Sequence, residues 1–357
     1  MKFVHIADMH FDMPFTVLSN NDLNLGNERR MEQRLVFKEI INYIKENNIE
    51  FLFIAGDLYE HQYVNKTTIE YINNLFKEIP NTKIFITPGN HDPLLQNSYY
   101  NTFDWNDNVH IFTNEIGIYE YENIDVYGYG FNDFYLREEK INKINIKNKE
   151  KINVLITHGS LEGGEGEDRE YNPLSKKELE ALGFDYIALG HIHKKNYSKQ
   201  ENKKIIYPGS LMALGFDELG EHGMIVGNIE KNKLSLEFIP LDKKEFKKLE
   251  IDVSEINFEE KLIEKINNIN LEENIYYKII LIGEKNIQIN LNNIKKYLIN
   301  KNIIKLKNNT KIKYDLEKIS NENNLRGIFV KELLNIKNSE NEDIIKNAIE
   351  LGLDSLK

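Results

Sequence analysis

Five apolar segments in the first 193 residues each run directly into a cluster of Asp, His, Asn and Gly. They end in Asp8-Met9-His10, Gly56-Asp57, Pro88-Gly89-Asn90-His91-Asp92, Thr157-His158-Gly159 and Gly190-His191-Ile192-His193. Short apolar runs that stop at such residues are typical of buried strands followed by turns. Because ligands of α/β sheets bind at the carboxyl ends of the strands, we expect these five ends to meet in one crevice.

Helical patterns separate these strands. Apolar residues recur near helical spacing from about 28 to 47, at Met31, Leu35, Ile40, Ile41 and Ile44, and again at Ile69, Ile72, Leu75, Phe76 and Ile79. Strands are predicted at 2–7, 50–56, 83–87, 153–157 and 186–189, with short ones near 109–113 and 124–128 and two more at 224–229 and 234–239. Strands that alternate with helices predict a layered α/β domain.

The charged stretch Leu241-Asp242-Lys243-Lys244-Glu245 breaks this pattern, so we place a domain boundary there, between domains at 1–242 and 243–357. The second domain is predicted to contain a strand at 249–253, a helix at 257–268, a strand at 276–282, a helix at 291–299 and a helical C-terminus. This order indicates a small α+β domain.

Composition excludes several classes of site. The chain contains no cysteine, which removes disulfides, Cys-ligated zinc, iron–sulfur clusters and thiol nucleophiles. It has no apolar run of about 18 residues that would span a membrane, and its first residues lack the long apolar core of a secretory signal. We therefore expect a soluble, cytoplasmic protein without a membrane association.

The net charge of −11 lies entirely in the first 244 residues. Residues 1–244 hold 27 Lys and Arg against 38 Asp and Glu, whereas residues 245–357 hold 19 of each. A protein that grips nucleic acid by itself usually carries the opposite sign. Either the substrate is not a long polyanion, or bound metal ions and a partner supply the positive field.

The side chains at the strand ends indicate a metal centre. Taken singly, an Asp after a strand is usually a cap or turn residue, and a lone His is usually structural. Histidine is scarce, however, and five of the nine histidines fall in these segments, at His10, His91, His158, His191 and His193. Asp, Asn and His together suit Mn²⁺, Fe or Zn²⁺ rather than a soft metal or calcium.

The motifs D-x-H, G-D, G-N-H-D, H-G and G-H-x-H, in this order, resemble those of the calcineurin-like metallophosphoesterases over residues 1–240. Within that superfamily the chain resembles the SbcD-like DNA-repair exonucleases, and especially the YhaO-like branch, in HIADMHFDMPF (5–15), IAGDLYE (54–60), TPGNHDPL (87–94), DYIALGHIHK (185–194) and IYPGS (206–210). The resemblance implies a layered β-sandwich flanked by helices. The segments at 250–254, 276–283 and 325–334 resemble the small capping domain of that family.

The resemblance also implies a division of ligands between two metal ions. One ion would be held by Asp8, His10, Asp57 and His193, and the other by Asp57, Asn90, His158 and His191. A carboxylate can bridge two cations, whereas an imidazole normally binds one, which agrees with a bridging Asp57. Two divalent ions, Mn²⁺ being favoured over Fe or Zn²⁺, would activate a water for attack on a phosphodiester.

Two further pairs of residues receive roles from the resemblance. His91 would face the phosphate as a catalytic residue, and Asp92 would fix the tautomer of its imidazole. The well-studied nucleases carry a His three residues after the bridging Asp, where this chain has Glu60, with His61 one position further on. Glu60 and His61 are therefore weak candidates for orienting the substrate, and His61 is otherwise expected to be an exposed residue at a helix start.

Three functions compete on this basis. The first is a DNA nuclease, acting as an exonuclease component with an SbcC-like ATPase, and the second is a phosphodiesterase or phosphatase for a small or nucleotide substrate. A non-catalytic scaffold is disfavoured because the ligand set is intact. Seven lysines between 295 and 313 form either a solvated face or a contact for DNA or a partner. The resemblance also allows a homodimer.

Overall fold

A computed structural model describes residues 1–161, 170–201, 203–285, 289–338 and 341–356. The chain divides into two compact units: Met1–Lys247 with Asn274–Tyr276, and Lys248–Glu273 with Tyr277–Lys357. The first unit continues past Asp242 because Phe246 is buried, with its ring 5.0 Å from that of Phe216 and 5.2 Å from that of Tyr276. No described helix combines the length and the apolar character needed to cross a membrane.

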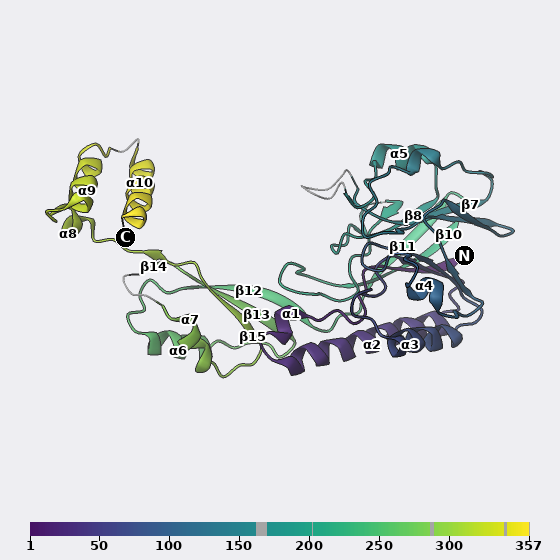
Figure 1. The fold of residues 1–357 in the computed structure, drawn as a ribbon, viewed down its shortest axis with the longest axis horizontal. Helices are drawn as coiled ribbons and strands as arrows, with labels where there is room; N and C mark the ends of the chain where they lie inside the picture. The colour runs from purple at the N-terminus through teal and green to yellow at the C-terminus, as the bar shows by residue number, and fades with distance from the viewer. Residues whose placement is uncertain (162–169, 202, 286–288, 339–340, 357) are drawn as a thin grey trace. The chain divides into compact units, whose positions relative to one another are not determined.

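Two sheets form the centre of the first unit (Figure 1). The six-stranded sheet has the order β11 (Lys233–Pro240), β10 (Gly223–Glu230), β1 (Lys2–Ile6), β2 (Phe51–Ala55), β3 (Lys83–Thr87) and β4 (Val109–Ile111). The five-stranded sheet has the order β5 (Gly117–Glu120), β6 (Ile124–Gly128), β7 (Ile152–His158), β8 (Tyr186–Gly190) and β9 (Ile205–Ile206). Strands β1 to β4 and β6 to β9 run parallel, whereas β10 and β5 are antiparallel to their inner neighbours.

The two sheets pack face to face, which confirms the expected layered α/β sandwich. Phe3 and Phe53 of the first sheet share one buried cluster with Val154 and Tyr186 of the second, and the rings of Phe3 and Tyr186 lie 4.6 Å apart. Because side chains alternate along a strand, Val4 of β1 points to the opposite face, where it joins the cluster that includes helix residues.

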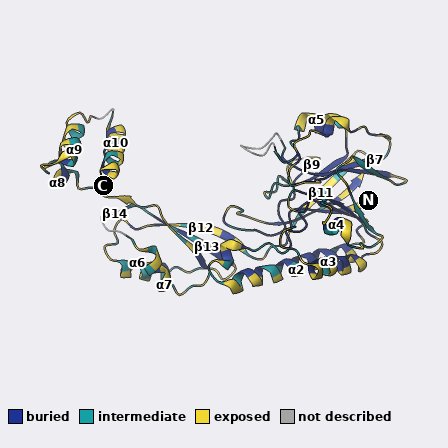
Figure 2. Ribbon diagram, viewed as in Figure 1, coloured by how far each residue is buried: buried dark blue, intermediate teal, exposed yellow. Residues whose placement is uncertain are grey.

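Helices cover the two outer faces of the sandwich (Figures 1 and 2). Helices α2 (Leu23–Glu46) and α3 (Lys66–Lys77) pack on the six-stranded sheet, and η1 (Ile141–Lys143) and α5 (Lys176–Leu182) pack on the five-stranded sheet. Two single-turn helices, α1 (Thr16–Ser19) and α4 (Tyr99–Thr102), lie in the connections. The strands of the sandwich are mostly dark blue in Figure 2, and the outward faces of α2 and α3 are largely yellow.

Helix α2 differs from its predicted form. It begins at Leu23, because the Asp22 side chain accepts a hydrogen bond from the backbone N–H of Asn24 at 2.9 Å and caps the helix there. Met31 and Leu35 were expected in its apolar face, but they are 60% and 61% exposed. At this end of the helix the buried face instead carries Arg29, Gln33 and Phe37, which follow one another at four-residue spacing.

Arg29 takes part in a buried ion pair. Its guanidinium is 0% exposed, and Nη1 donates to Asp242 Oδ1 and to Glu32 at 2.9 Å each. Nη2 donates to the second oxygen of Asp242 and, at 3.0 Å, to the carbonyl of Ala213. The two-pronged pair fixes α2 against the segment that follows β11.

The second unit contains a three-stranded sheet with helices. Its sheet has the order β12 (Glu245–Asp252), β13 (Ile275–Ile282) and β15 (Ile303–Asn308), and β14 (Glu284–Lys285) pairs with β16 (Lys311–Ile312). Its helices are α6 (Glu259–Asn267), α7 (Leu291–Lys296), α8 (Leu316–Ser320), α9 (Leu325–Asn335) and α10 (Glu342–Ser355). The prediction of a helical C-terminus after 299 missed β15 and β16. Exposed Lys305 and Lys307 alternate with the less exposed Ile304 and Leu306, which is the pattern of a strand.

Candidate metal centre

The seven predicted metal ligands all lie at the carboxyl ends of strands in the first unit. They follow or end β1, β2, β3, β7 and β8, at Asp8, His10, Asp57, Asn90, His158, His191 and His193. Backbone hydrogen bonds hold the loops together, since Asp8 N–H donates to the carbonyl of Gly56 at 3.1 Å and His10 N–H to that of Asp57 at 2.9 Å. The predicted crevice is therefore formed by the loops of both sheets.

The backbone is strained at four of these positions. Asp8, His10, Asp57 and His191 have φ angles of 52°, 50°, 53° and 101°, a region that side chains with a Cβ rarely occupy. Each such residue costs on the order of 1–3 kcal/mol, and such strain concentrates at functional sites. Its occurrence at four predicted ligands supports a functional role for this crevice.

Close approach of the loops also requires glycine. A Cβ atom on Gly89 would lie 2.2 Å from a carboxylate oxygen of Asp57. A Cβ atom on Gly56, where φ is +87°, would lie 2.3 Å from Nδ1 of His158. The backbone at these two positions thus comes as near to the candidate ligands as a glycine permits.

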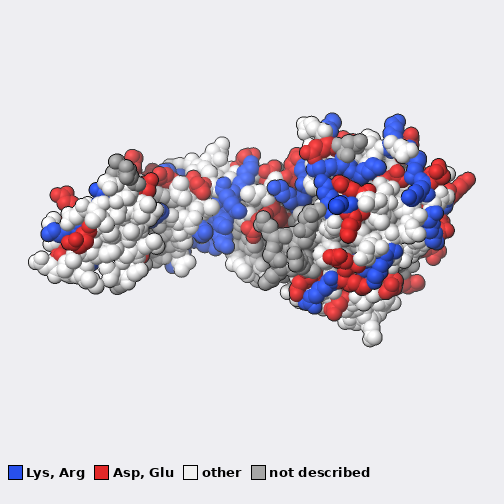
Figure 3. All heavy atoms as spheres, turned by 90° about the horizontal axis from the view of Figure 1, so that it is seen from above, with Lys and Arg blue, Asp and Glu red and all other residues white. Residues whose placement is uncertain are grey.

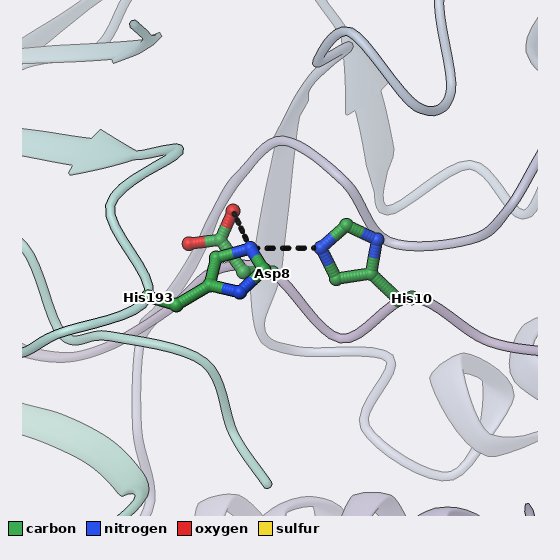
Figure 4. Close-up of side chains that lie close together, drawn as sticks. All are labelled: Asp8, His10 and His193. Atoms are coloured by element: carbon green, nitrogen blue, oxygen red, sulfur yellow. Dashed lines mark hydrogen bonds and ion pairs between the residues drawn. The ribbon is translucent and has the colours of Figure 1, made fainter. Parts of the chain in front are cut away.

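Asp8, His10 and His193 form the first group of candidate ligands (Figure 4). Nε2 of His10 and Nε2 of His193 point toward one another at 3.1 Å, and Nε2 of His193 lies 3.9 Å from Asp8 Oδ1. Asp57 Oδ2 lies 3.8 Å from Nε2 of His10. Two ring nitrogens and carboxylate oxygens converging in this way suit a single cation between them.

Asp57, Asn90, His158 and His191 form the second group. Nε2 of His158 lies 3.3 Å from Asp57 Oδ2 and 3.0 Å from Asn90 Oδ1, and Nδ1 of His191 lies 3.2 Å from the same Asn90 oxygen. Nδ1 of His158 donates to the carbonyl of Ala55 at 2.8 Å, which leaves Nε2 as the ligating atom. Asp57 Oδ2 thus lies next to both groups, the place that a bridging carboxylate would take.

Two glutamates orient the imidazoles of the first group. His10 Nδ1 is 2.8 Å from Glu60, and His193 Nδ1 is 2.7 Å from Glu218. An Nδ1–H that donates to a carboxylate leaves the Nε2 lone pair facing the site, which is the usual support of metal-binding histidines. Glu218 is itself held, because Ser210 donates to its second oxygen at 2.8 Å.

The electrostatics of the centre fit bound cations. Asp8 and Asp57 are 0% and 1% exposed, and all ion pairs of these two carboxylates within the described residues are to histidines. Burial raises the pKa of Asp8. Burial also opposes ionisation of Asp57, but the adjacent His158 holds the pKa of that carboxyl well below its usual range. Buried carboxylates without a Lys or Arg partner are satisfied well by divalent ions.

His91 lies at the edge of the centre. Its side chain is 45% exposed, its Nδ1 lies 3.1 Å from Glu60, and its backbone N–H donates to Asp57 Oδ1 at 2.8 Å. Burial lowers the pKa of His91, but the Glu60 hydrogen bond and the charge of Asp57 outweigh it and raise the pKa to about 9. The imidazole is therefore a cation at neutral pH when the centre holds no metal.

Asp92 does not contact the imidazole of His91, contrary to expectation. Its fully buried carboxylate accepts from the backbone N–H groups of Gly89 at 2.6 Å, Leu58 at 2.7 Å and Asp57 at 3.1 Å, and from the Tyr100 hydroxyl at 2.5 Å. The Asp92 carboxylate thus links the loop after β3 to the loop after β2. It also supplies acceptors to backbone N–H groups that would otherwise be buried without a partner. Glu60 holds the imidazole instead.

His61 also differs from its prediction. It lies in a turn, and α3 begins later, at Lys66, where Asn65 caps the helix. The backbone N–H of His61 donates to the His91 carbonyl at 2.9 Å, and partial burial lowers the pKa of its imidazole. His61 is therefore half-buried rather than an exposed helix-start residue.

A cavity of about 380 Å³ opens beside the centre. It is lined by Glu60, Gln62, Asn90, His91, Phe134, Tyr135 and Tyr171. One side of the cavity thus carries a candidate metal ligand and His91, and the rest includes three aromatic rings.

Residues 1–195 match the calcineurin-like phosphoesterase family, over more than half of the chain. The chain belongs to this family. Its members hydrolyse phosphoesters with divalent metals, and the two groups of ligands provide candidate positions for such ions in this chain.

Among the curated proteins similar to this chain are three relatives. The uncharacterized metallophosphoesterase YhaO of Bacillus subtilis is 26% identical over 71% of this chain and 64% of its own length, so the chain spans less than two thirds of that relative. The SbcD subunit of the SbcCD nuclease of Staphylococcus epidermidis is 29% identical over 78% of this chain and 79% of its own length. The SbcD subunit of Staphylococcus saprophyticus is 27% identical over 78% of each chain.

TT1561 of Thermus thermophilus is one of the solved structures that are similar to part of this chain. It aligns with 66% of this chain and 98% of its own, at 9% identity and a TM-score of 0.36. This likeness is too weak to add to the family assignment.

Sequence reasoning missed one residue of the phosphoesterase centre. Glu218 stands in the run Phe216-Asp217-Glu218, to which the sequence analysis assigned no role. The only signal in the sequence is an acidic residue shortly after the segment IYPGS (206–210). Its hydrogen bond to His193 spans 25 positions and depends on the turn after β9.

Proposed function

We propose that this chain is a two-metal phosphodiester hydrolase and that its physiological substrate is DNA. The observation that carries the proposal is the position of Asp57 Oδ2, 3.8 Å from Nε2 of His10 and 3.3 Å from Nε2 of His158, between two groups of ligands. One ion would be held by Asp8, His10, Asp57 and His193. The other would be held by Asp57, Asn90, His158 and His191. When bound, two ions of Mn²⁺, Fe or Zn²⁺ supply an activated water and neutralise charge on the phosphate.

His91 would protonate the leaving oxygen. Glu60 accepts from its Nδ1 at 3.1 Å, so Nε2 is the ring atom available to a substrate. A raised pKa keeps the imidazole protonated near neutral pH, as a general acid requires. Glu60 positions both this imidazole and the candidate ligand His10, and it would act on substrate through them.

Two features support DNA as the substrate. The Staphylococcus relatives are named as nuclease subunits, and the alignment reaches 78% of this chain, beyond what the catalytic unit alone contains. The second unit also carries exposed lysines on β15 and near it, including Lys305, Lys307 and Lys313, which could contact phosphates. We propose that this unit caps the site for a large substrate.

The acidic catalytic unit favours a second candidate, a phosphodiesterase for a small or nucleotide substrate. Residues 1–244 carry 38 acidic against 27 basic residues. On the face shown in Figure 3, Lys and Arg are mixed with Asp and Glu over the catalytic unit. Such a surface binds long polyanions weakly without a partner.

A partner ATPase of the SbcC type would explain an apolar surface in the second unit. The short helical segment at the C-terminus exposes large apolar side chains: Leu325 is 69%, Ile328 59%, Ile344 70% and Leu351 71% exposed. Isolated apolar side chains are ordinary, but several on neighbouring helices indicate a protein interface. Homodimer formation and a cytoplasmic location stay predictions.

The decisive assay uses the purified full chain with Mn²⁺. It compares single- and double-stranded DNA with bis-p-nitrophenyl phosphate, with and without an SbcC-like ATPase, and uses Asp57→Asn as the inactive control. Cleavage of DNA that falls steeply with added salt and is absent in the control supports the nuclease. If the protein hydrolyses the small ester but not DNA, even with the ATPase present, the nuclease proposal is rejected in favour of the small-substrate phosphodiesterase. If Asp57→Asn keeps both activities, the two-metal centre is refuted.

A further inference from the structure

The cavity beside His91 has an aromatic wall, formed by Phe134, Tyr135 and Tyr171. Its volume of about 380 Å³ falls in the range of small-ligand sites. The general acid and the ligand Asn90 line the same cavity, so a group bound against the wall would lie next to the reacting phosphate. None of the three residues is fully buried, although Tyr171 packs against the core on the five-stranded sheet.

Backbone pairing holds two of these rings side by side. Leu136 N–H donates to the carbonyl of Glu170 at 2.9 Å, and Asn172 N–H donates to the carbonyl of Leu136 at 2.6 Å. This short bridge brings Tyr135 and Tyr171 together, with ring centroids 5.8 Å apart and planes inclined by 31°. The buried side chain of Leu136 anchors the bridge in the core.

The wall continues to the metal centre. The ring of Tyr171 lies 5.1 Å from that of the candidate ligand His191, at an angle of 35°. At the other end the guanidinium of Arg137 lies 5.1 Å from the centroid of the Tyr135 ring and pairs with Glu170 at 2.8 Å. A row of flat groups therefore runs outward from the ligands to a cationic side chain.

We infer that the aromatic wall binds one unpaired nucleobase of the substrate, next to the scissile phosphate. Every base offers a π-face, and single-stranded nucleic acid binds to protein aromatics by stacking, largely without regard to sequence. A base inside a duplex is already stacked and paired, so the wall favours single-stranded or frayed ends. Stacking also supplies binding that a catalytic unit with excess negative charge cannot obtain from phosphate contacts. The inference rests on the proposed phosphodiesterase activity and names its substrate class as nucleotidyl esters.

Two esters with the same leaving group test the inference in Mn²⁺-loaded protein. Thymidine 5′-(p-nitrophenyl phosphate) carries a base, and methyl p-nitrophenyl phosphate does not. Tyr135→Ala and Tyr171→Ala should each lower kcat/KM for the thymidine ester by about 5- to 150-fold, mainly through KM, which is the range expected for losing one stacked base. Because the methyl ester carries no base, the readout is the ratio of kcat/KM for the thymidine ester to kcat/KM for the methyl ester, and this ratio should fall by that factor in each variant. Tyr135→Phe keeps the ring and should behave like the wild type, as should Tyr297→Ala, which removes an exposed tyrosine in the second unit.

A binding measurement separates failure of the inference from failure of the proposed activity. Calorimetry compares thymidine 5′-phosphate with deoxyribose 5-phosphate on the full chain. The wild type should bind the nucleotide at least 5-fold more tightly, and the double Tyr135→Ala, Tyr171→Ala variant should bind both equally. A wild type without this preference overturns the inference, even if both esters are hydrolysed. A wild type that shows the preference but hydrolyses neither ester retains the base site and refutes the proposed activity.

Discussion

Replacing Glu60 by Gln should shift the alkaline limb of the pH–rate profile. Glu60 is a buried carboxylate that accepts from Nδ1 of His10 at 2.8 Å and from Nδ1 of His91 at 3.1 Å. Gln is nearly isosteric but neutral, and its single carbonyl oxygen can accept well from only one of these two donors. The change therefore removes the negative charge that stabilises the His91 imidazolium and leaves the fold in place.

The size of the shift follows from the lost hydrogen bond. A bond from a cation to a carboxylate contributes about 1.5–3 kcal/mol, and one to a neutral acceptor about 0.5–1.5 kcal/mol. The difference, roughly 1–1.5 kcal/mol, corresponds to about one pKa unit. Because the His91 side chain is 45% exposed, solvent screening makes one unit the upper end. The hydrogen bond raises the pKa of His91, so its loss lowers that pKa.

The assay is kcat against pH for a dinucleoside phosphate such as thymidylyl-(3′→5′)-thymidine at saturating Mn²⁺, because its alkoxide leaving group requires the proton of a general acid. A general acid must be protonated, so activity falls as pH rises through the pKa of His91, which is about 9 in the metal-free centre and lower beside bound cations. Glu218→Gln is the matched control, since Glu218 holds His193 in the same way without touching His91. Both variants should bind Mn²⁺ about 10–100-fold more weakly. The assignment of His91 as the general acid is refuted if the alkaline limb of the pH–rate profile does not move in Glu60→Gln, or if it moves equally in Glu60→Gln and Glu218→Gln.

Three other changes give sharp outcomes. Asp57→Asn should lose both metal equivalents and Asp8→Asn mainly one, as counted by elemental analysis of the purified variants; two ions retained in Asp57→Asn would exclude a bridging role. His91→Asn should lower kcat by about 10²–10⁴-fold at unchanged metal content, the range for losing a general acid, and parallel loss of metal would make His91 structural. Asp242→Ala should cost up to about 3–5 kcal/mol in urea unfolding, because the buried Arg29 would lose its two-pronged partner and keep only Glu32 and the Ala213 carbonyl; a cost below about 1 kcal/mol would contradict that account.

The positions of the ligands could be predicted because each depends on a local pattern. An apolar strand that ends in Asp, His or Asn is visible in the sequence, and parallel strands bring such ends together. Partners of the ligands could not be predicted in this way. Glu60 contacts His10 across 50 positions, and Glu218 contacts His193 across a turn. The role of Asp92 could not be predicted because its place next to His91 in the sequence does not reveal the buried backbone N–H groups that its carboxylate accepts from.

The fold was predictable where periodicity was strong. The strand expected at 83–87 has those bounds in β3, and β10 and β11 lie within a residue of their predictions. The prediction that Met31 and Leu35 lie in the buried face of α2 was wrong, because an apolar residue near helical spacing need not face the sheet. In the second unit β15 is short and half polar, so its period of two residues was lost among the lysines. Short elements depend on their neighbours more than on their own sequence.

The dispersal of the ligands over five strand ends has a consequence for how the protein is made. His10 and His193 are separated by 183 positions, and their ring nitrogens meet only after β8 has joined its sheet. At synthesis rates of about 5–20 residues per second, roughly 10–40 s pass between the emergence of the two side chains from the ribosome. The nascent chain therefore offers no complete centre to a passing ion during this time. Cation loading can therefore begin only after His193 has emerged and β8 has paired, and the metal acquired depends on which ions are present from that moment.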